Sequence, residues 1–179
     1  MVYLIKNDIM HIKEMIYLNR EAKKGLWEYI HAHDSMIDEV HGNTYFSEPI
    51  AFEMDDGDIK ESIRPYTMGR IIDVEGFLKD YPCDPDGGTL LIELDITDKL
   101  LSWNNRSFQV CFEDGHCHLT DKPAEYKLKM DIATLTTLLL GYKTAERLYE
   151  LERISGRKEA VDRLDDVLFH KIPYISDYI

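Results

Sequence analysis

Four side chains that could bind a metal ion fall within one short segment of the chain. They are Cys111, Glu113, His116 and His118. Asp114 and Gly115 supply the positive φ angles of a type I′ turn, so the spacing predicts a β-hairpin with all four side chains on one face. A thiolate, a carboxylate and imidazoles have the chemistry of a zinc site. The simpler interpretation is a solvent-exposed hairpin face. We therefore predict no metal site, and a metal-binding protein built on this hairpin remains an alternative.

A second segment with possible chemistry, residues 20–25, reads Arg-Glu-Ala-Lys-Lys-Gly and lies between a predicted strand and a predicted helix. Backbone amides and the helix dipole can bind a pyrophosphate at such a position. Acetyltransferases of the GNAT class place an Arg/Gln-x-x-Gly-x-Gly/Ala loop there. In this chain Lys23 replaces the first glycine and is followed by Gly25. Because the lysine side chain would obstruct the phosphates, we predict no cofactor-binding residue in this chain.

Two further clusters are better explained as ordinary structure. His31 and His33 stand two positions apart on a predicted helix, where side chains do not face each other. The acidic segment 55–58 lacks the alternating ligands and the distal glutamate of a calcium loop, which favours a turn. The sequence contains no Gly-x-Ser-x-Gly, Walker or HExxH motif. The motifs alone therefore identify no catalytic residue.

The composition narrows the possible partners and the cellular location. The 179 residues include 34 acidic and 21 basic ones, which gives a formal net charge of −13, and 44% are apolar, enough for a hydrophobic core. This charge repels nucleic acid and anionic membranes and favours cationic partners such as amines. No apolar run is long enough to span a membrane, and no signal peptide is visible. With Cys83, Cys111 and Cys117 as an odd set of thiols, we expect a cytoplasmic protein with reduced cysteines.

The first part of the chain reads as strand, strand and helix. The expected elements are strands at 1–5 and 10–18, a helix capped by Asn19 that reaches Val40 with an interruption near Asp34-Ser35, a strand at 45–54 interrupted by Pro49, a helical turn through Ile63 and a strand at 66–74. Few domains begin inside a hairpin. This beginning therefore suggests a part of a longer protein.

The remainder reads as strands followed by helices, which is typical of an α+β layer. The expected elements are a helix from Val74, strands at 89–96, 108–112, 116–120 and 126–130, and helices at 131–141, from Thr144 and at 157–169. Asp131 can cap the first of the last three helices, and Gly141 can end it in a left-handed conformation. The final segment 172–179 is rich in large apolar side chains, so we expect it to pack onto the body of the protein.

Seven segments form a pattern that runs through essentially the whole chain. They are 12–19, Gly25-Leu26-Trp27, Arg64-Pro65-Tyr66, 69–74, Trp103-Asn104-Asn105, 131–141 and 173–179. In this order they resemble the C-terminal part of the enhanced intracellular survival-type GNAT acetyltransferases. No single short motif carries the resemblance.

The resemblance implies a fold, a domain boundary and an activity. Residues 1–73 would be the later part of a degenerate GNAT-like domain, a partial sheet-and-helix unit that has lost cofactor binding. Residues 74–179 would be a sterol carrier protein-like domain, a layer of antiparallel strands packed by helices. The catalytic GNAT domain, which binds acetyl-CoA, would precede residue 1 in the full-length protein. This chain alone would then be inactive.

The family's chemistry also implies a role for the end of the chain. The terminal α-carboxylate, here that of Ile179 where family members often have Phe, would reach the cleft of the absent domain and accept a proton from the amine substrate. The general acid, a tyrosine of that domain, has no counterpart here. The implied substrate is a cationic amine of the aminoglycoside or basic-peptide type. The family also implies a homo-oligomer.

Two alternatives concern segments that the resemblance covers. Trp103, Asn104 and Asn105 are expected to fix a loop and not to touch the substrate, because asparagine serves turns and tryptophan anchors cores. The final segment could simply pack against the last helix, with its carboxylate in solvent. The chain as a whole could be a stand-alone sterol carrier-like module that binds a lipid or another apolar ligand.

Overall fold

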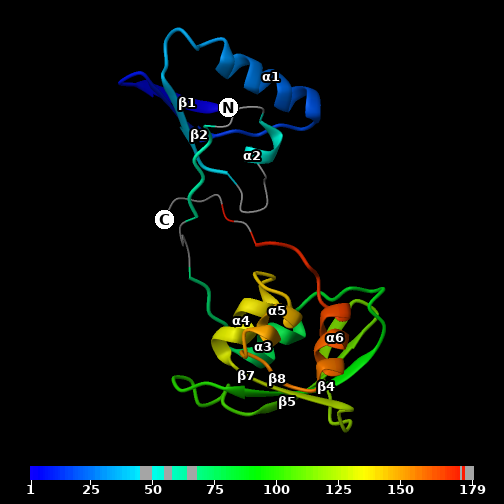
Figure 1. Ribbon diagram of the computed structural model, residues 1–179. Helices are drawn as coiled ribbons and strands as arrows, with labels where there is room; N and C mark the ends of the chain where they lie inside the picture. Colours follow the sequence, from blue (N-terminus) through cyan, green and yellow to red (C-terminus); the bar gives the residue numbers. More distant parts are fainter. Residues whose placement is uncertain (45–49, 55–57, 64–67, 174, 176–179) are drawn as a thin grey trace. The chain divides into compact units, whose positions relative to one another are not determined.

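The contacts of the chain define two units, Met1–Ile63 and Arg64–Ile179. Figure 1 shows the computed structural model, which describes residues 1–179 except 45–49, 55–57, 64–67, 174 and 176–179. The division after Ile63 follows from the contacts alone. A domain boundary near Asp73 stays a prediction.

The first unit is a small sheet with one helix in its crossover connection. Its elements are β1 (Val2–Lys6), β2 (Ile9–Glu14), α1 (Arg20–His31), β3 (Glu39–Gly42) and α2 (Ile50–Glu53). Strands β1 and β2 are antiparallel, and β3 pairs with β2 in parallel. As predicted, Asn19 caps α1, because its Oδ1 atom accepts a hydrogen bond from the amide of Ala22 at 2.8 Å. The predicted order of strand, strand and helix is confirmed.

Four elements predicted for the first seventy-four residues are wrong where the structure describes them. The helix does not continue to Val40, because tight turns follow His31 and Val40 pairs with Met10 in the sheet. Residues 50–53 form the single helical turn α2 in place of a strand. The helical turn through Ile63 and the strand at 66–74 are absent from the described residues 58–63 and 68–73. The predicted acidic turn lies mostly outside the described residues.

The second unit is a five-stranded sheet packed by helices, so the predicted α+β fold is confirmed. The strands are β4 (Leu90–Thr97), β5 (Ser107–Glu113), β6 (His116–Leu119), β7 (Tyr126–Asp131) and β8 (Ser155–Gly156), in the spatial order β6-β5-β4-β7-β8. Alternate residues of β4 are buried, which matches the period of two for a strand with one face on the core. Strand β8 was not among the predicted strands.

One strand pair in this sheet departs from the predicted antiparallel layer, because β7 runs parallel to β4. The register explains this arrangement. Leu119 at the end of β6 pairs with Val110, which pairs with Ile92, and Ile92 pairs with Tyr126 at the start of β7. Strand β6 has only four residues and ends at Leu119, beside the point where β7 begins across β4. The chain therefore crosses to the other side of β4 there, and β7 runs in the same direction as β6.

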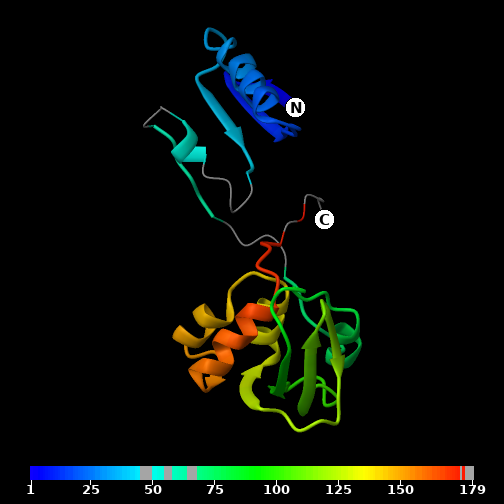
Figure 2. The same cartoon turned by 90° about the vertical axis from the view of Figure 1, so that its right-hand side faces the viewer.

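The helices of the second unit bury one face of the sheet. They are α3 (Val74–Lys79), α4 (Ile132–Leu139), α5 (Ala145–Glu150) and α6 (Lys158–Val167). Asp73, Asp131 and Thr144 cap α3, α4 and α5 through their side chains. In Figure 2, α4, α5 and α6 gather on one side of the strands, and their buried side chains join those of β4, β5 and β7 in one core cluster. No helix within the described residues is long and apolar enough to cross a lipid bilayer.

Candidate functional site

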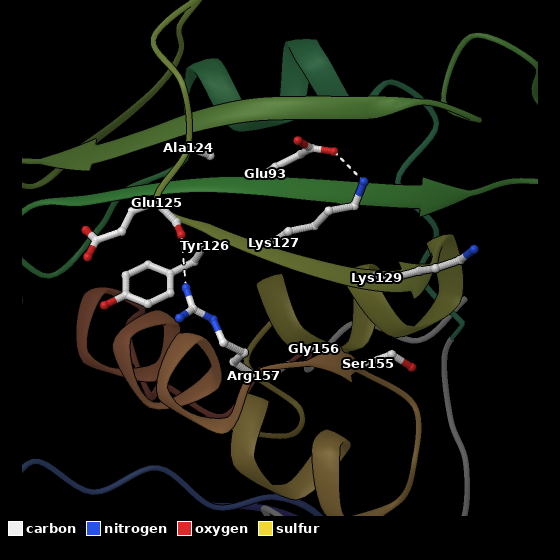
Figure 3. Close-up of a pocket in the computed structure, with 9 residues that line it drawn as sticks. All are labelled: Glu93, Ala124, Glu125, Tyr126, Lys127, Lys129, Ser155, Gly156 and Arg157. Carbon is white, nitrogen blue, oxygen red and sulfur yellow. Dashed lines mark hydrogen bonds and ion pairs between the residues drawn. The ribbon is translucent and has the colours of Figure 1, made fainter.

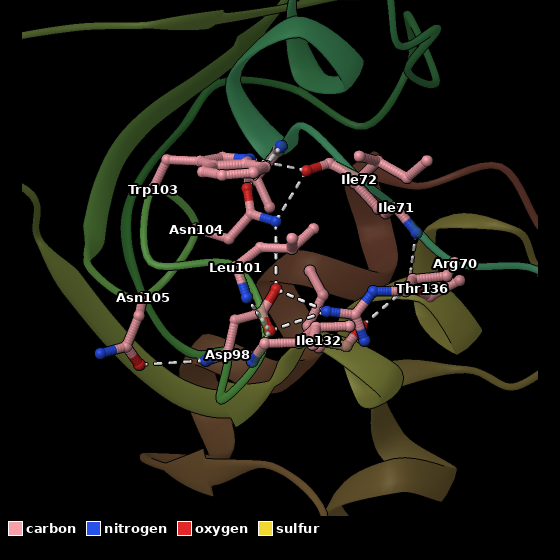
Figure 4. Close-up of polar contacts among 12 residues, drawn as sticks. Arg70, Ile71, Ile72, Asp98, Leu101, Trp103, Asn104, Asn105, Ile132 and Thr136 are labelled. Atoms are coloured by element: carbon pink, nitrogen blue, oxygen red, sulfur yellow. Dashed lines mark hydrogen bonds and ion pairs between the residues drawn. The ribbon is translucent and has the colours of Figure 1, made fainter.

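A polar network joins the start of the second unit to the loop that follows β4 (Figure 4). Its centre is Asp98, whose carboxylate is almost completely buried. The Arg70 guanidinium donates to both carboxylate oxygens at 2.7 and 2.8 Å. The backbone amides of Leu100 and Leu101 also donate to Asp98, at 2.9 and 3.1 Å. The loop and the segment before α3 are therefore held together by one carboxylate.

Asn104 extends this network to the backbone that leads into α3. Its side chain accepts a hydrogen bond from the amide of Val74 at 3.1 Å and donates to the carbonyl of Ile72 at 2.9 Å. The Asn104 side-chain nitrogen also donates to the Asp98 carboxylate at 3.1 Å. Asn104 is 1% exposed, so these bonds satisfy polar groups that water does not reach.

Trp103 and Asn105 complete the attachment of the loop. The indole of Trp103 donates to the carbonyl of Ile72 at 2.9 Å, and Asn105 accepts from the amide of Asp98 at 3.0 Å. The prediction that residues 103–105 fix a loop is confirmed by these bonds. The expectation that Trp103 anchors the core is wrong, because its side chain is 56% exposed and acts as a hydrogen-bond donor at the surface.

Asp98 should make the stability of the second unit depend on acid pH. Burial alone would raise the pKa of Asp98, but hydrogen bonds from Leu101, Leu100, Asn104 and Arg70 together lower it well below the usual range. Because the pKa is lower in the folded state, the stabilisation is present above the ordinary carboxyl pKa of about 3.9 and is lost as the pH falls further.

The expected result is a steeper loss of unfolding free energy between about pH 4 and pH 2 for the wild type than for Asp98→Asn. Urea titrations at several pH values would measure both slopes. Equal slopes for the two proteins would show that the carboxylate has no such role.

After α6 the chain passes next to the end of α4 at Lys171. The described residues of the final segment, Ile172, Pro173 and Ile175, are exposed, so the expected packing of this segment onto the body is wrong for them. Gly141 follows α4 with a φ of 73°, as predicted for a left-handed end. A Cβ atom on Gly141 would lie 2.2 Å from the carbonyl oxygen of Lys171, so the returning chain passes directly over this glycine. A small cavity of about 150 Å³ lies here, lined partly by Leu138, Leu168 and Ile172. The proposed base Ile179 lies outside the described residues, and its role stays a prediction.

Replacing Gly141 by alanine should destabilise the second unit by at least about 1–2 kcal/mol, since a left-handed residue with a side chain is strained and the Lys171 backbone would also have to move. Gly88→Ala is a matched control, because Gly88 has a φ of 77° but its nearest heavy atom to an added Cβ is 3.8 Å away. Urea unfolding would measure both. A loss at Gly141 no larger than that at Gly88 would contradict the close approach.

The segment 20–25 is not a loop between a strand and a helix, because its residues form the first turns of α1. The amide of Lys23 donates to the carbonyl of Asn19 at 3.1 Å within the helix. The Lys23 ammonium forms an ion pair with Glu53 and lies 5.0 Å from the centre of the Tyr17 ring. These contacts do not fit a cradle for a pyrophosphate. That this chain lacks a cofactor-binding residue stays a prediction.

The hairpin β5–β6 brings three of the four predicted metal-ligand candidates together. Asp114 and Gly115 have φ values of 51° and 78°, which confirms the predicted turn. The ligand atoms of Cys111, Glu113 and His118 all lie within 4.8 Å of one another. Because Cys111 is 2% exposed, the interpretation of this face as plain solvent surface is wrong at that residue.

The remaining histidine candidates have other surroundings. His116 lies opposite Glu113 but does not belong to the group of three ligand atoms. His33 is hydrogen-bonded through Nδ1 to the carbonyl of Tyr29 at 2.8 Å and packs against that tyrosine ring. Within the described part of the chain, His31 and His33 join no cluster of three metal ligands.

A concavity of about 540 Å³ beside β7 and β8 was not predicted from the sequence (Figure 3). Its charged groups largely pair with one another. Lys127 binds Glu93 at 2.7 Å, and Arg157 donates to the carbonyl of Glu125 at 3.1 Å while lying over the Tyr126 ring. The residues come from separate strands and connections, so no local motif announces this concavity. Five of its nine lining residues are charged (Glu93, Glu125, Lys127, Lys129 and Arg157), which is unusual for a pocket that binds an apolar ligand.

Family comparisons find a match in both parts of the chain. Residues 74–176 match the family described as sterol carrier protein domain, and residues 1–71 match the family described as acetyltransferase (GNAT) domain. No curated protein matches the chain.

Solved structures extend this similarity to the whole chain. A conserved protein of unknown function from Enterococcus faecalis V583, described as a probable N-acyltransferase, is 30% identical with a TM-score of 0.90, over 99% of this chain and 45% of that one. A GCN5-related N-acetyltransferase from Anabaena variabilis ATCC 29413 is 21% identical with a TM-score of 0.78, over 99% and 46%. Eis1 from Mycobacterium abscessus is 19% identical with a TM-score of 0.74, over 96% and 43%. The chain thus spans less than half the length of each of these proteins.

Proposed function

Because the chain belongs to the sterol carrier protein domain family and carries a GNAT segment before that domain, we propose that it is the C-terminal part of an N-acyltransferase of the enhanced intracellular survival type. The observation that carries this proposal is the similarity to the Enterococcus protein, which extends over 99% of this chain at a TM-score of 0.90. The shared order of the two segments supports a common architecture.

In this proposal, this chain and a separate GNAT domain have different roles. Acetyl-CoA would supply the acetyl group, and a separate GNAT domain would bind it, since residues 20–25 form helix α1 with Lys23 paired to Glu53. This chain would contribute the scaffold and one wall of the substrate cleft. The carboxylate of Ile179 would accept the proton that the amine loses when it is acylated.

The proposed substrate is a cationic amine, such as an aminoglycoside or a basic peptide. The formal charge of −13 supports this choice, because an acidic surface attracts cations and raises their local concentration. A homo-oligomer is proposed for the full-length protein by resemblance to its family.

The alternative of a lipid-binding module receives less support from the cavities of the second unit. Ligand pockets typically enclose about 300–1,000 Å³ and are mostly apolar. The cavity of about 150 Å³ beside Gly141 is below that range, and the larger concavity is lined by Glu93, Lys127 and Arg157. The helices instead fill the covered face of the sheet with their own side chains.

An acetyl-transfer assay tests the proposal. The purified chain would be incubated with acetyl-CoA and a panel of aminoglycosides and basic peptides, alone and together with a separately produced GNAT domain of an N-acyltransferase with this architecture. Mass spectrometry would detect the acetylated amine. We expect no product from the chain alone and amine acetylation from the mixture, above that of the added domain by itself. Turnover by the chain alone, or no effect of the chain on the added domain, would oppose the proposal.

A further inference from the structure

The hairpin β5–β6 carries a group of ligand atoms that the proposed acyl transfer does not use. Cys111 and His118 are directly opposite each other in the strand register, and Glu113 is two residues along β5 on the same face. The Nε2 atom of His118 lies 3.7 Å from a carboxylate oxygen of Glu113, which is too long for a hydrogen bond. The three side chains therefore lie close together, but His118 and Glu113 do not form a hydrogen bond with each other.

The spacing suits a small tetrahedral ion. With zinc bonds of about 2.0–2.3 Å, ligand atoms around one ion lie about 3.3–3.7 Å apart. The three ligand atoms here lie within 4.8 Å of one another, so side-chain shifts of about an ångström would close the site. Two paired strands and a tight turn hold the backbone, and the amide of Cys83 donates to the carbonyl of Gly115 at 3.1 Å. The ligands are thus placed by a fixed framework.

The charges of the group also suit a divalent cation. Zinc binds cysteine as the thiolate, so a bound divalent ion would be surrounded by a thiolate, a carboxylate and a neutral imidazole. The two negative charges would then balance the ion.

We propose that Cys111, Glu113 and His118 form a binding site for Zn²⁺ or a similar divalent transition metal, with the fourth position open to water. Three protein ligands with one open position are common for zinc, and the thiolate and imidazole disfavour magnesium or calcium. This proposal is independent of acyl transfer, because it rests on the hairpin alone.

Cobalt substitution of the full chain tests this site. Adding Co²⁺ to metal-free protein should produce thiolate-to-cobalt charge-transfer absorption and release about one proton per ion, and Zn²⁺ should then displace Co²⁺ and abolish the absorption. Glu113→Gln and His118→Ala should weaken Zn²⁺ binding at least 10-fold, measured by competition with a chelator. Removing a residue that only orients a metal ligand weakens metal binding about 10–100-fold, so removing a ligand itself should weaken it at least as much.

His116→Ala is the matched control, since this exposed histidine lies on the same hairpin outside the group. It should change the affinity less than about two-fold, well under the loss expected for a ligand or its partner. Cys111→Ser should abolish the charge-transfer band. If this substitution of a buried residue impairs folding, the weakened Zn²⁺ binding of Glu113→Gln still tests the site. Absence of the band in the wild type, or equal losses from His116→Ala and His118→Ala, would overturn the assignment.

Discussion

Converting the terminal carboxylate of Ile179 to a carboxamide should lower amine acetylation by the reconstituted enzyme about 100- to 10,000-fold, the range expected for loss of a general base. The two groups have nearly the same size, but the amide is uncharged and does not accept a proton near neutral pH. The change therefore tests the proposed chemistry without shortening the chain. Semisynthesis of the final segment would supply the protein, and kcat/KM for a chosen amine is the measurement.

A matched control separates the carboxylate from the side chain that bears it. Ile179→Phe retains the terminal carboxylate and a large apolar group, so its kcat/KM should stay within a few-fold of the wild type, because the proton acceptor is unchanged. The pH profile adds a second criterion, since a lost base should remove the acidic limb of the profile. An amidated enzyme with wild-type activity would assign the base to another group.

Asn104→Ala should lower the free energy of unfolding of the second unit by about 2–4 kcal/mol. The substitution would leave the amide of Val74 without its acceptor and would remove one donor each from the carbonyl of Ile72 and from Asp98. Asn104 is 1% exposed, so water would not readily replace these partners. Urea unfolding followed by tryptophan fluorescence in a Trp27→Phe background, where Trp103 is the remaining tryptophan, would report on this unit.

Asn105→Ala provides the comparison. Asn105 is exposed and accepts one hydrogen bond, from the amide of Asp98 at 3.0 Å, so its loss should cost about 0.5–1.5 kcal/mol. If Asn104→Ala and Asn105→Ala lower the free energy of unfolding equally, the burial of Asn104 does not increase its contribution to stability.

Features that depend on neighbouring residues were predictable from the sequence. The Asp114-Gly115 turn, the Asn19 and Asp131 caps and the left-handed Gly141 each follow from the conformational preference of one or two residues. The buried alternation in β4 was visible for the same reason. These signals do not require knowledge of distant partners.

Features that depend on distant partners were not predictable in this way. Val40 fits a helical apolar pattern, yet it pairs with Met10 because the sheet of the first unit supplies a better partner. The parallel pairing of β4 with β7 depends on how early β6 ends. Arg70 and Asp98 are 28 residues apart, and no local pattern links them.

The candidate sites also differ in whether they depend on neighbouring or on distant residues. The register of the hairpin placed Cys111 and His118 opposite each other, as the structure shows. Burial of Cys111 was not evident from alternation, since its face was expected to be exposed. The concavity beside β7 draws its charges from β4, β7 and the segment after β8, so it exists only in the folded sheet.

Native mass spectrometry with acetyl-CoA tests whether this chain is one part of an N-acyltransferase whose cofactor is bound by another domain. We expect the chain alone to keep an unchanged mass in the presence of acetyl-CoA. With the separately produced GNAT domain present, we expect a complex that carries both the domain and one acetyl-CoA. A stoichiometric acetyl-CoA adduct of the chain alone would oppose the proposed function and would make the Lys23 segment a candidate cofactor site.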